Sequence, residues 1–241
     1  MNILLKITQT FFHLFFKLNS IKSPKIKSLI FTDIFKNSNQ KINSIKNSLK
    51  SESELFQEIF VLNKTNFKTK GFFVEFGACD GISFSNTYLL EKKFEWQGIL
   101  AEPCKYFHIN LKNNRNCNLS FDCVDKESGS KIKFFENENK SLSRSIDKNQ
   151  KESYEVTSIS LNDLLEEFNA PINFDYLSID TEGNEYQILE TFDFTKYKPK
   201  IITCEHNYRT EREKISNLLI KNGYKKFQSK FTKYDDWFII D

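Results

Sequence analysis

The sequence lacks the patterns on which several common sites depend. Its five cysteines form no CxxC pair, and the chain has only seven glycines and four prolines in 241 residues. The odd cysteine count, without a secretory signal, indicates free thiols in a reducing, cytoplasmic environment, so we expect neither a disulfide nor a zinc site. No GxGxxG turn is present, which argues against the usual dinucleotide site.

The charge is unevenly distributed along the chain. Residues 1–50 hold nine lysines and one acidic residue, giving +8, whereas residues 51–241 hold 26 basic and 31 acidic residues, giving −5. An acidic domain does not attract the phosphate backbone, so we do not expect a nucleic acid as substrate.

We predict that residues 1–70 form a basic helical extension. The opening, MNILLKITQTFFHLFFKL, is interrupted by polar residues and has no small-residue cleavage site. It falls short of the roughly 20 apolar residues that span a bilayer, so we predict neither a signal peptide nor a transmembrane helix. Two roles are open for it: residues 1–30 lie on the inner membrane surface as an amphipathic helix, or the helix packs on the domain or mediates oligomerisation.

From residue 71 onward, strand-like and helix-like segments alternate, which predicts a doubly wound, mainly parallel sheet with helices on both faces. The last segment, residues 225–241, reads as two strands without a helix between them and predicts an antiparallel hairpin at one edge. Ser160 is the expected N-cap of one helix, with Asp163 three residues later. We place strands at about 72–76, 98–103, 118–124, 173–180 and 198–207, and helices at about 85–94, 104–115, 158–169, 184–191 and 211–224.

The segment GFFVEFGACDGISFSNTYLLEKKF, residues 71–94, joins the first strand to a helix through a turn with two glycines, Gly77 and Gly81. Glu75 and Asp80 place carboxylates beside this turn. Carboxylates repel a pyrophosphate but suit the ammonium and sulfonium groups of S-adenosylmethionine. The turn therefore predicts a cationic adenosyl cofactor.

Two further acidic residues complete the predicted cofactor site. Glu102 ends the second strand, 21 residues after Gly81, where a carboxylate accepts hydrogen bonds from both ribose hydroxyls. Asp122 follows in SFDCV, and two readings of it are open: it contacts the adenine amino group, or it faces solvent as the strand alternates.

Four stretches give the chain a family resemblance: FVEFGACDGISFSNTYLLE, WQGILAEP, DYLSIDTEGNEYQILETFDF, and CEHN followed by LLIKNGY. In this order they resemble the FkbM family of S-adenosylmethionine-dependent methyltransferases, over about two thirds of the chain. The resemblance implies a Rossmann-like, class I, seven-stranded methyltransferase domain over residues 71–241. It also implies methyl transfer to oxygen, most often on a sugar, as in a polysaccharide, or on a secondary metabolite.

The resemblance also assigns cofactor contacts. Many members have Asn where Cys79 stands, so one amide contact is missing here. The family's turn falls on Glu75, Gly77, Ala78, Asp80 and Gly81, with Ser85 and Asn86 at the start of the next helix and Glu102 as the ribose acid.

For catalysis, Asp180 is our first candidate as acceptor-side base or orienting carboxylate, because it ends the fourth strand beside the expected crevice. Glu182 follows it closely. The alternative is that Asp180 caps the helix that begins near residue 184 or contacts the cofactor. Glu205 and His206 form a second pair at the end of the fifth strand, and the usual pKa of histidine suits proton removal at neutral pH.

These same four residues are of types that bind Mg²⁺ or Mn²⁺, but the resemblance does not require an ion and we predict no metal. The polar residues 137–151 are either an acceptor lid, with Arg144 against an acidic sugar, or a solvated loop. We therefore predict an O-methyltransferase that acts on a glycan or small hydroxylated metabolite. The rivals are methylation of RNA or protein, and a non-catalytic cofactor-binding scaffold of the same fold.

Overall fold

The computed structural model describes residues 43–44, 46–48, 50–135, 153–227 and 232–240. It divides into two compact units, residues 1–50 and residues 51–241, so the structural boundary lies twenty residues before the predicted one. The described residues 43–44 and 46–48 of the first unit are helical. Two predicted segments, the membrane contact at 1–30 and the lid at 137–151, lie outside the described residues. Within the described ranges, no helix is both long enough and apolar enough to span a bilayer.

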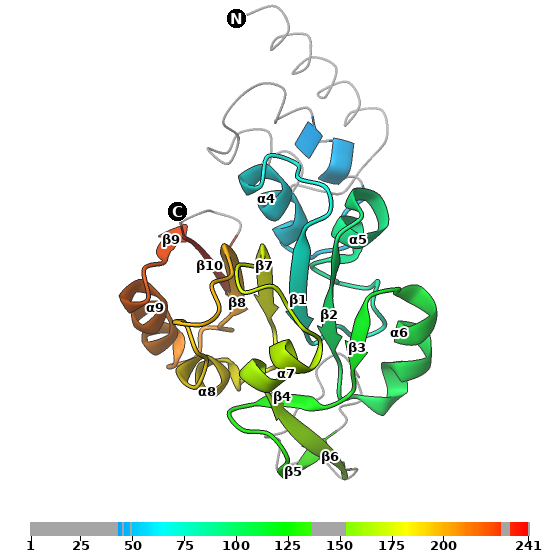
Figure 1. Cartoon of the computed structure of the whole chain (residues 1–241), viewed down its shortest axis with the longest axis vertical. Coiled ribbons are helices and arrows are strands. Elements are labelled where there is room, and N and C mark those ends of the chain that lie inside the picture. Colours follow the sequence, from blue (N-terminus) through cyan, green and yellow to red (C-terminus); the bar gives the residue numbers. More distant parts are fainter. Residues whose placement is uncertain (1–42, 45, 49, 136–152, 228–231, 241) are drawn as a thin grey trace, which may run out of the picture. The chain divides into compact units, whose positions relative to one another are not determined.

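The second unit is built on a seven-stranded sheet with the strand order β3-β2-β1-β7-β8-β10-β9 (Figure 1). Strand β10 runs antiparallel to both neighbours, and the pairs among β1, β2, β3, β7 and β8 are parallel. The mainly parallel sheet and its antiparallel edge hairpin are thus confirmed. The strands are β1 (Phe72–Phe76), β2 (Gln97–Ala101), β3 (Asn118–Ser120), β7 (Tyr176–Ile179), β8 (Ile201–Glu205), β9 (Lys225–Phe227) and β10 (Asp235–Ile239).

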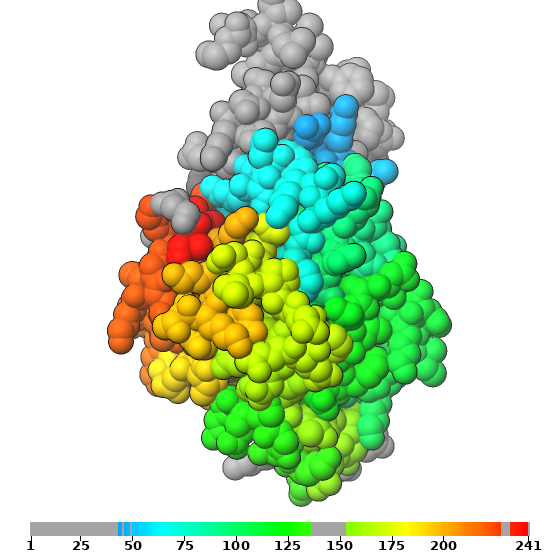
Figure 2. Space-filling model, in the orientation of Figure 1, coloured from blue at the N-terminus to red at the C-terminus, as the bar shows by residue number. Residues whose placement is uncertain are grey.

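A smaller three-stranded sheet has the order β4-β6-β5, with β4 (Cys123–Asp125), β5 (Lys131–Phe135) and β6 (Ser153–Ser160). Figure 2 shows its residues, in green and yellow-green, at the lower end of the second unit. The prediction of one strand over 118–124 was wrong, because β3 and β4 belong to different sheets. The neighbour β2 ends opposite Ser120, so β3 has no partner strand beyond that residue.

Helices cover both faces of the large sheet, as predicted. Ser160 caps α7 by accepting a 3.1 Å hydrogen bond from the Asp163 backbone N–H. Buried residues of α7, α8 and α9 share one apolar core with the sheet, whereas α4 packs on the opposite face through Phe60, whose ring centroid is 4.5 Å from that of Trp237. The helices are α4 (Gln57–Lys64), α5 (Tyr88–Phe94), α6 (His108–Asn114, preceded by a 3₁₀ turn at Lys105–Phe107), α7 (Leu161–Glu167), α8 (Glu185–Glu190) and α9 (Arg212–Lys221).

The two faces of the sheet differ in chemistry. Since side chains alternate along each strand, the residues next to those in the apolar core point toward the side of α4. In register across the strands these are Glu75, Ser178, Thr203 and Trp237. The sheet therefore presents a buried polar row on the α4 side, and this row leads to the candidate site.

Candidate functional site

The glycine turn at the end of β1 is shaped by the chain's own backbone. Gly77 has a φ of +70°, and a Cβ at this residue would lie 2.2 Å from the Asp180 carbonyl oxygen. Gly81 has a φ of +81°, and a Cβ there would lie 2.6 Å from Cγ of Arg115. Both positions need glycine for conformation and for space. Ala78, between them, is buried.

Glu102 lies directly against this turn. Its Oε2 accepts a 2.7 Å hydrogen bond from the Cys79 backbone N–H, and its Oε1 accepts one of 2.8 Å from the Cys104 N–H. Burial raises the pKa of Glu102 to about 7. Because each carboxylate oxygen has two lone pairs, Glu102 keeps acceptor capacity for a ligand.

The other acidic residues near the turn are arranged differently. Asp80 turns its carboxylate to its own loop, where Oδ1 accepts from the N–H groups of Ile82 and Ser83 at 2.9 and 2.7 Å. Asp122 lies between β3 and β4, partly exposed, and burial raises its pKa. The contact of Asp80 and Asp122 with a cofactor stays a prediction.

Glu75 binds the start of the next helix. Its Oε1 accepts a 2.6 Å hydrogen bond from the Asn86 N–H, and its Oε2 accepts from the hydroxyls of Ser85, at 3.0 Å, and Thr87. Burial raises the pKa of Glu75, and the charge of Arg115 opposes this rise. The predicted cofactor ligands Glu75 and Ser85 thus have intramolecular partners, and their contact with a cofactor stays a prediction.

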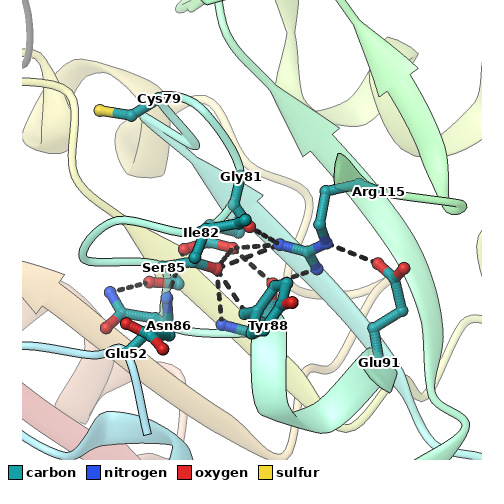
Figure 3. Close-up of polar contacts among 12 residues, drawn as sticks. Glu52, Cys79, Gly81, Ile82, Ser85, Asn86, Tyr88, Glu91 and Arg115 are labelled. Atoms are coloured by element: carbon teal, nitrogen blue, oxygen red, sulfur yellow. Dashed lines mark hydrogen bonds and ion pairs between the residues drawn. The ribbon is translucent and has the colours of Figure 1, made fainter. Parts of the chain in front are cut away.

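Arg115 is a central residue that no sequence motif indicated. Its side chain is fully buried, with Nη1 3.9 Å from Glu75 Oε2. Figure 3 shows the guanidinium group between Gly81, Ser85 and Glu91, while Cys79 points away from this cluster. It donates to the Gly81 carbonyl at 3.0 Å, to Ser85 at 3.1 Å and to Glu91 at 2.6 Å.

An acidic pocket opens beside the turn, on the α4 side of the sheet. Asp180 and Glu205 are neighbours there because Ile179 and Cys204, the residues before them, pair in register. Carboxylate oxygens of Asp180, Glu182 and Glu205 all lie within 4.8 Å of one another. The pocket is lined by Glu54, Gln57, Phe84, Asn86, Ser178, Ile179, Asp180, Thr203, Glu205, Tyr234 and Asp235.

This crowding of carboxylates changes their titration. Burial, followed by the charge of Glu205, raises the pKa of Asp180 well above its ordinary value. Burial, followed by the charges of Glu182 and Glu185, raises the pKa of Glu205 to about 8. A proton therefore stays on the pair near neutral pH.

The hydrogen bonds at the start of α8 involve Glu185, not Asp180. Its Oε1 accepts from the N–H groups of Thr181 and Gly183 at 3.2 and 2.8 Å. Glu182 pairs with Arg209 at 3.3 Å. The capping alternative for Asp180 thus finds no support among the described hydrogen bonds, and its carboxylate lines the pocket instead.

His206 is not among the residues that line this pocket. Its Nδ1 accepts a 2.9 Å hydrogen bond from the Tyr208 N–H, and its Nε2 lies 3.7 Å from Asp236 Oδ1. Burial lowers the pKa of His206. Side-chain alternation places Glu205 and His206 on opposite faces, so the structure brings Asp180, Glu182 and Glu205 together and leaves His206 apart.

Comparison with known proteins identifies the family. No curated protein matches the chain closely enough to count as a relative. A solved methyltransferase FkbM from Methylobacillus flagellatus KT is similar in fold, with a TM-score of 0.50 and 12% identity over 90% of this chain and 58% of that one. A precorrin-6y C5,15-methyltransferase from Geobacter metallireducens GS-15 gives a TM-score of 0.43 and 14% identity over 76% of this chain and 85% of that one. The family model for the methyltransferase FkbM domain matches residues 75–238, so this chain belongs to the FkbM family of methyltransferases.

Proposed function

We propose that the chain transfers a methyl group from S-adenosylmethionine to a hydroxyl group of a sugar, a glycan or a small metabolite. The observation that carries this proposal is the contact between Gly77 and the Asp180 carbonyl, which makes the cofactor turn and the acidic pocket neighbours. A transfer between two bound molecules needs two adjoining subsites that hold the reacting atoms in line.

The turn and Glu102 fit the cofactor. The backbone of residues 77–81 would hold its amino acid part, and the free lone pairs of the Glu102 carboxylate would accept from the two ribose hydroxyls. Asp122 would accept a hydrogen bond from the adenine amino group, as the sequence predicts. When bound, S-adenosylmethionine supplies a methyl group on a positively charged sulfur. Arg115 offsets Glu75, so the ionised form of Glu102, whose pKa is about 7, is the carboxylate that would favour that cation.

The acidic pocket supplies the base. As the acceptor oxygen bonds to the methyl carbon, the hydroxyl proton passes to the deprotonated member of the Asp180 and Glu205 pair, and the electrons of the broken S–C bond return to sulfur. A carboxylate with a pKa of about 8 is a far better base than an ordinary one. Glu182, held by Arg209, orients the acceptor. His206 does not line this pocket, and its catalytic role stays a prediction.

The lining of the pocket supports a polyhydroxylated acceptor. Ser178 and Thr203 add hydroxyl groups to the carboxylates, and the ring of Phe84, 62% exposed, stands at the pocket as an apolar surface. Few polar groups beside an aromatic surface are typical of small-molecule sites. An acidic pocket repels phosphates, which weighs against RNA.

Calorimetry with S-adenosylmethionine tests the cofactor, and tritium transfer from labelled cofactor into a lysate glycan fraction tests the acceptor. We expect binding by the full chain, weakened by Glu102→Ala but not by Glu127→Ala, which removes an exposed carboxylate far along the chain. No heat with the wild type refutes the proposal. Binding without any transfer favours the scaffold, and label in the RNA or protein fraction favours those acceptors.

A further inference from the structure

Three carboxylates form a cluster at the pocket, and two of them have no basic ion-pair partner among the described residues. Asp180, Glu182 and Glu205 come from two adjacent strand ends and one turn, with oxygens within 4.8 Å of one another. Among the described residues, no lysine or arginine forms an ion pair with Asp180 or Glu205. Arg209 approaches from beside them and pairs with Glu182 at 3.3 Å and Glu185 at 3.6 Å. The two central carboxylates therefore lack a cation from the described chain.

Asn86 gives an independent indication of a ligand. It is 9% exposed and lines the same pocket, and its Nδ2 is fixed by a 3.0 Å hydrogen bond to Ser178 Oγ. Its Oδ1 is buried and, in the described part of the chain, has no hydrogen-bond donor. Glu205 Oε2 is in the same condition. Buried acceptors without donors are costly, so a positive ligand would satisfy both.

We propose that this pocket binds one divalent cation of the Mg²⁺, Mn²⁺ or Ca²⁺ type, with Asp180, Glu182 and Glu205 as ligands and Asn86 Oδ1 as a further oxygen. Such ions take oxygen ligands at about 2.0 to 2.6 Å, so oxygens on opposite sides of one ion lie about 4 to 5 Å apart. The spacing of the cluster matches this, and a set without sulfur or imidazole excludes a preference for softer metals. Arg209 pairs with Glu182 alone among the three carboxylates, so the negative charges of Asp180 and Glu205 are available to the ion.

The ion would act on the acceptor, a role that rests on the proposed methyl transfer. Gly77 touches the Asp180 carbonyl, so an ion held by Asp180 lies next to the cofactor turn. A hydroxyl group bound to a divalent cation loses its proton more readily, because the positive charge stabilises the alkoxide. With the ion bound, the proton leaves to solvent water, and Asp180 and Glu205 serve as ligands. Proton transfer to this pair, as described under the proposed function, then applies to the pocket without an ion.

Titration of the full chain with Mn²⁺, followed by electron paramagnetic resonance of the free ion, tests the site without cofactor or acceptor. We expect one saturable Mn²⁺ per chain, displaced by Mg²⁺ or Ca²⁺. Glu205→Gln and Asp180→Asn should each weaken binding by about tenfold or more, the scale seen when groups around a metal are removed. In the matched control, Glu54→Gln, the substituted residue lines the same pocket but is not one of the three clustered carboxylates, so this variant should change affinity by less than about twofold.

Any of three results would overturn the proposed metal site. The first is no saturable binding of any of the three ions, and the second is unchanged Mn²⁺ affinity in both Glu205→Gln and Asp180→Asn. The third is an equal loss of affinity in Glu54→Gln, which would mean that the general negative charge of the pocket, and not a defined set of ligands, attracts the ion. Thermal unfolding checks that the variants fold, and removal of one repelling carboxylate should not lower their melting temperature. Calorimetry with S-adenosylmethionine is a separate readout. Metal binding without cofactor binding would end the methyl-transfer proposal alone. Saturable metal binding with chelator-resistant transfer would leave the site standing and end only the role of its ion in the transfer.

Discussion

Replacing Gly77 by alanine is the sharpest test of how the turn is built. The added Cβ would lie 2.2 Å from the Asp180 carbonyl oxygen, which is a backbone atom and cannot rotate away. In addition, the φ of +70° is one that alanine adopts only with strain. The substitution must therefore move β1 or β7 where the two strands meet.

The size of the effect follows from two contributions. A left-handed conformation costs a non-glycine residue about 1 to 2 kcal/mol, and forcing an extra methyl group into a packed interior costs about 1 to 3 kcal/mol. We thus expect Gly77→Ala to lower the free energy of unfolding by about 2 to 5 kcal/mol. Gly129 is the matched control, because its φ is +83° but nothing lies within 4 Å of a Cβ there. Gly129→Ala should lose only the first contribution.

Urea unfolding followed by tryptophan fluorescence measures both variants, since Trp96 and Trp237 are 2% and 0% exposed and report on the core. The difference between the two losses isolates the contact between the turn and Asp180. Equal losses in Gly77→Ala and Gly129→Ala would refute the reasoning, because the close approach of the two strands would then have no energetic consequence.

Four further predictions follow from the same contacts and from the sequence. Arg115→Met should cost about 3 to 5 kcal/mol of unfolding free energy in urea because it leaves Glu75 buried without its cation, and a double variant with Glu75→Gln should lose less. Burial raises the pKa of Glu58 from 4.5 to about 8, so between these pH values the folded chain holds a proton that the unfolded chain has lost. The free energy of unfolding should therefore fall as pH rises through this range, by at most about 1.4 kcal/mol per pH unit. Glu58→Gln should flatten this slope, as measured by thermal unfolding at several pH values. Cys79 has a φ of +48°, which asparagine tolerates better than cysteine. Cys79→Asn should therefore raise the melting temperature slightly, and a lower melting temperature would contradict this prediction. Deletion of residues 1–30 should abolish sedimentation with anionic vesicles, and unchanged sedimentation would show that the membrane contact is wrong.

Periodicity and turn chemistry were sufficient to predict the large sheet. Strands alternate with helices from residue 71 onward, and chain order alone then favours parallel neighbours. The small sheet could not be predicted, because it depends on β3 ending at Ser120, where its neighbour β2 ends. The length of a strand is set by the length of its neighbour rather than by the propensity of its own residues. The spacing from the turn to Glu102 survived because it reflects one strand, one helix and one strand of ordinary length.

The candidate site was predicted by position but not by orientation. The sequence places Asp180, Glu205 and His206 at strand ends, yet only the pleat and the register decide which face each one meets. Glu205 joins Asp180, whereas His206 joins Asp236 on the other face. Because residues 205 and 206 are adjacent, their side chains point to opposite faces, and only one of them can face the pocket. The pairing of Ile179 with Cys204 shows that this residue is Glu205.

Arg115 and Glu58 show a different kind of failure. Glu58 stands in an apolar helix and accepts from the Ser51 hydroxyl and the Leu89 N–H, and Arg115 joins loops over thirty residues earlier. Contacts of this range arise only after folding brings the elements together, so no local pattern announces them. A charged residue among apolar ones, as in QEIFVL, was the only signal available, and it predicts burial without naming a partner.

The treatment of other buried acids explains why the pocket at Asp180 and Glu205 stands out. Elsewhere the fold gives buried acids partners from the chain. Asp175 pairs with two lysines, at 2.7 and 3.1 Å, and Asp236 pairs with an arginine at 2.9 Å and a lysine at 2.6 Å. Glu58 and Glu102 instead accept hydrogen bonds from N–H or hydroxyl groups of the chain. The chain is rich in lysine, so a cation could have been placed here as well. Unpaired buried carboxylates destabilise a fold, and a protein retains such a cost mainly where a site requires it. Because this exception lies where two strand ends meet the glycine turn, the missing charge is best supplied by what the site binds.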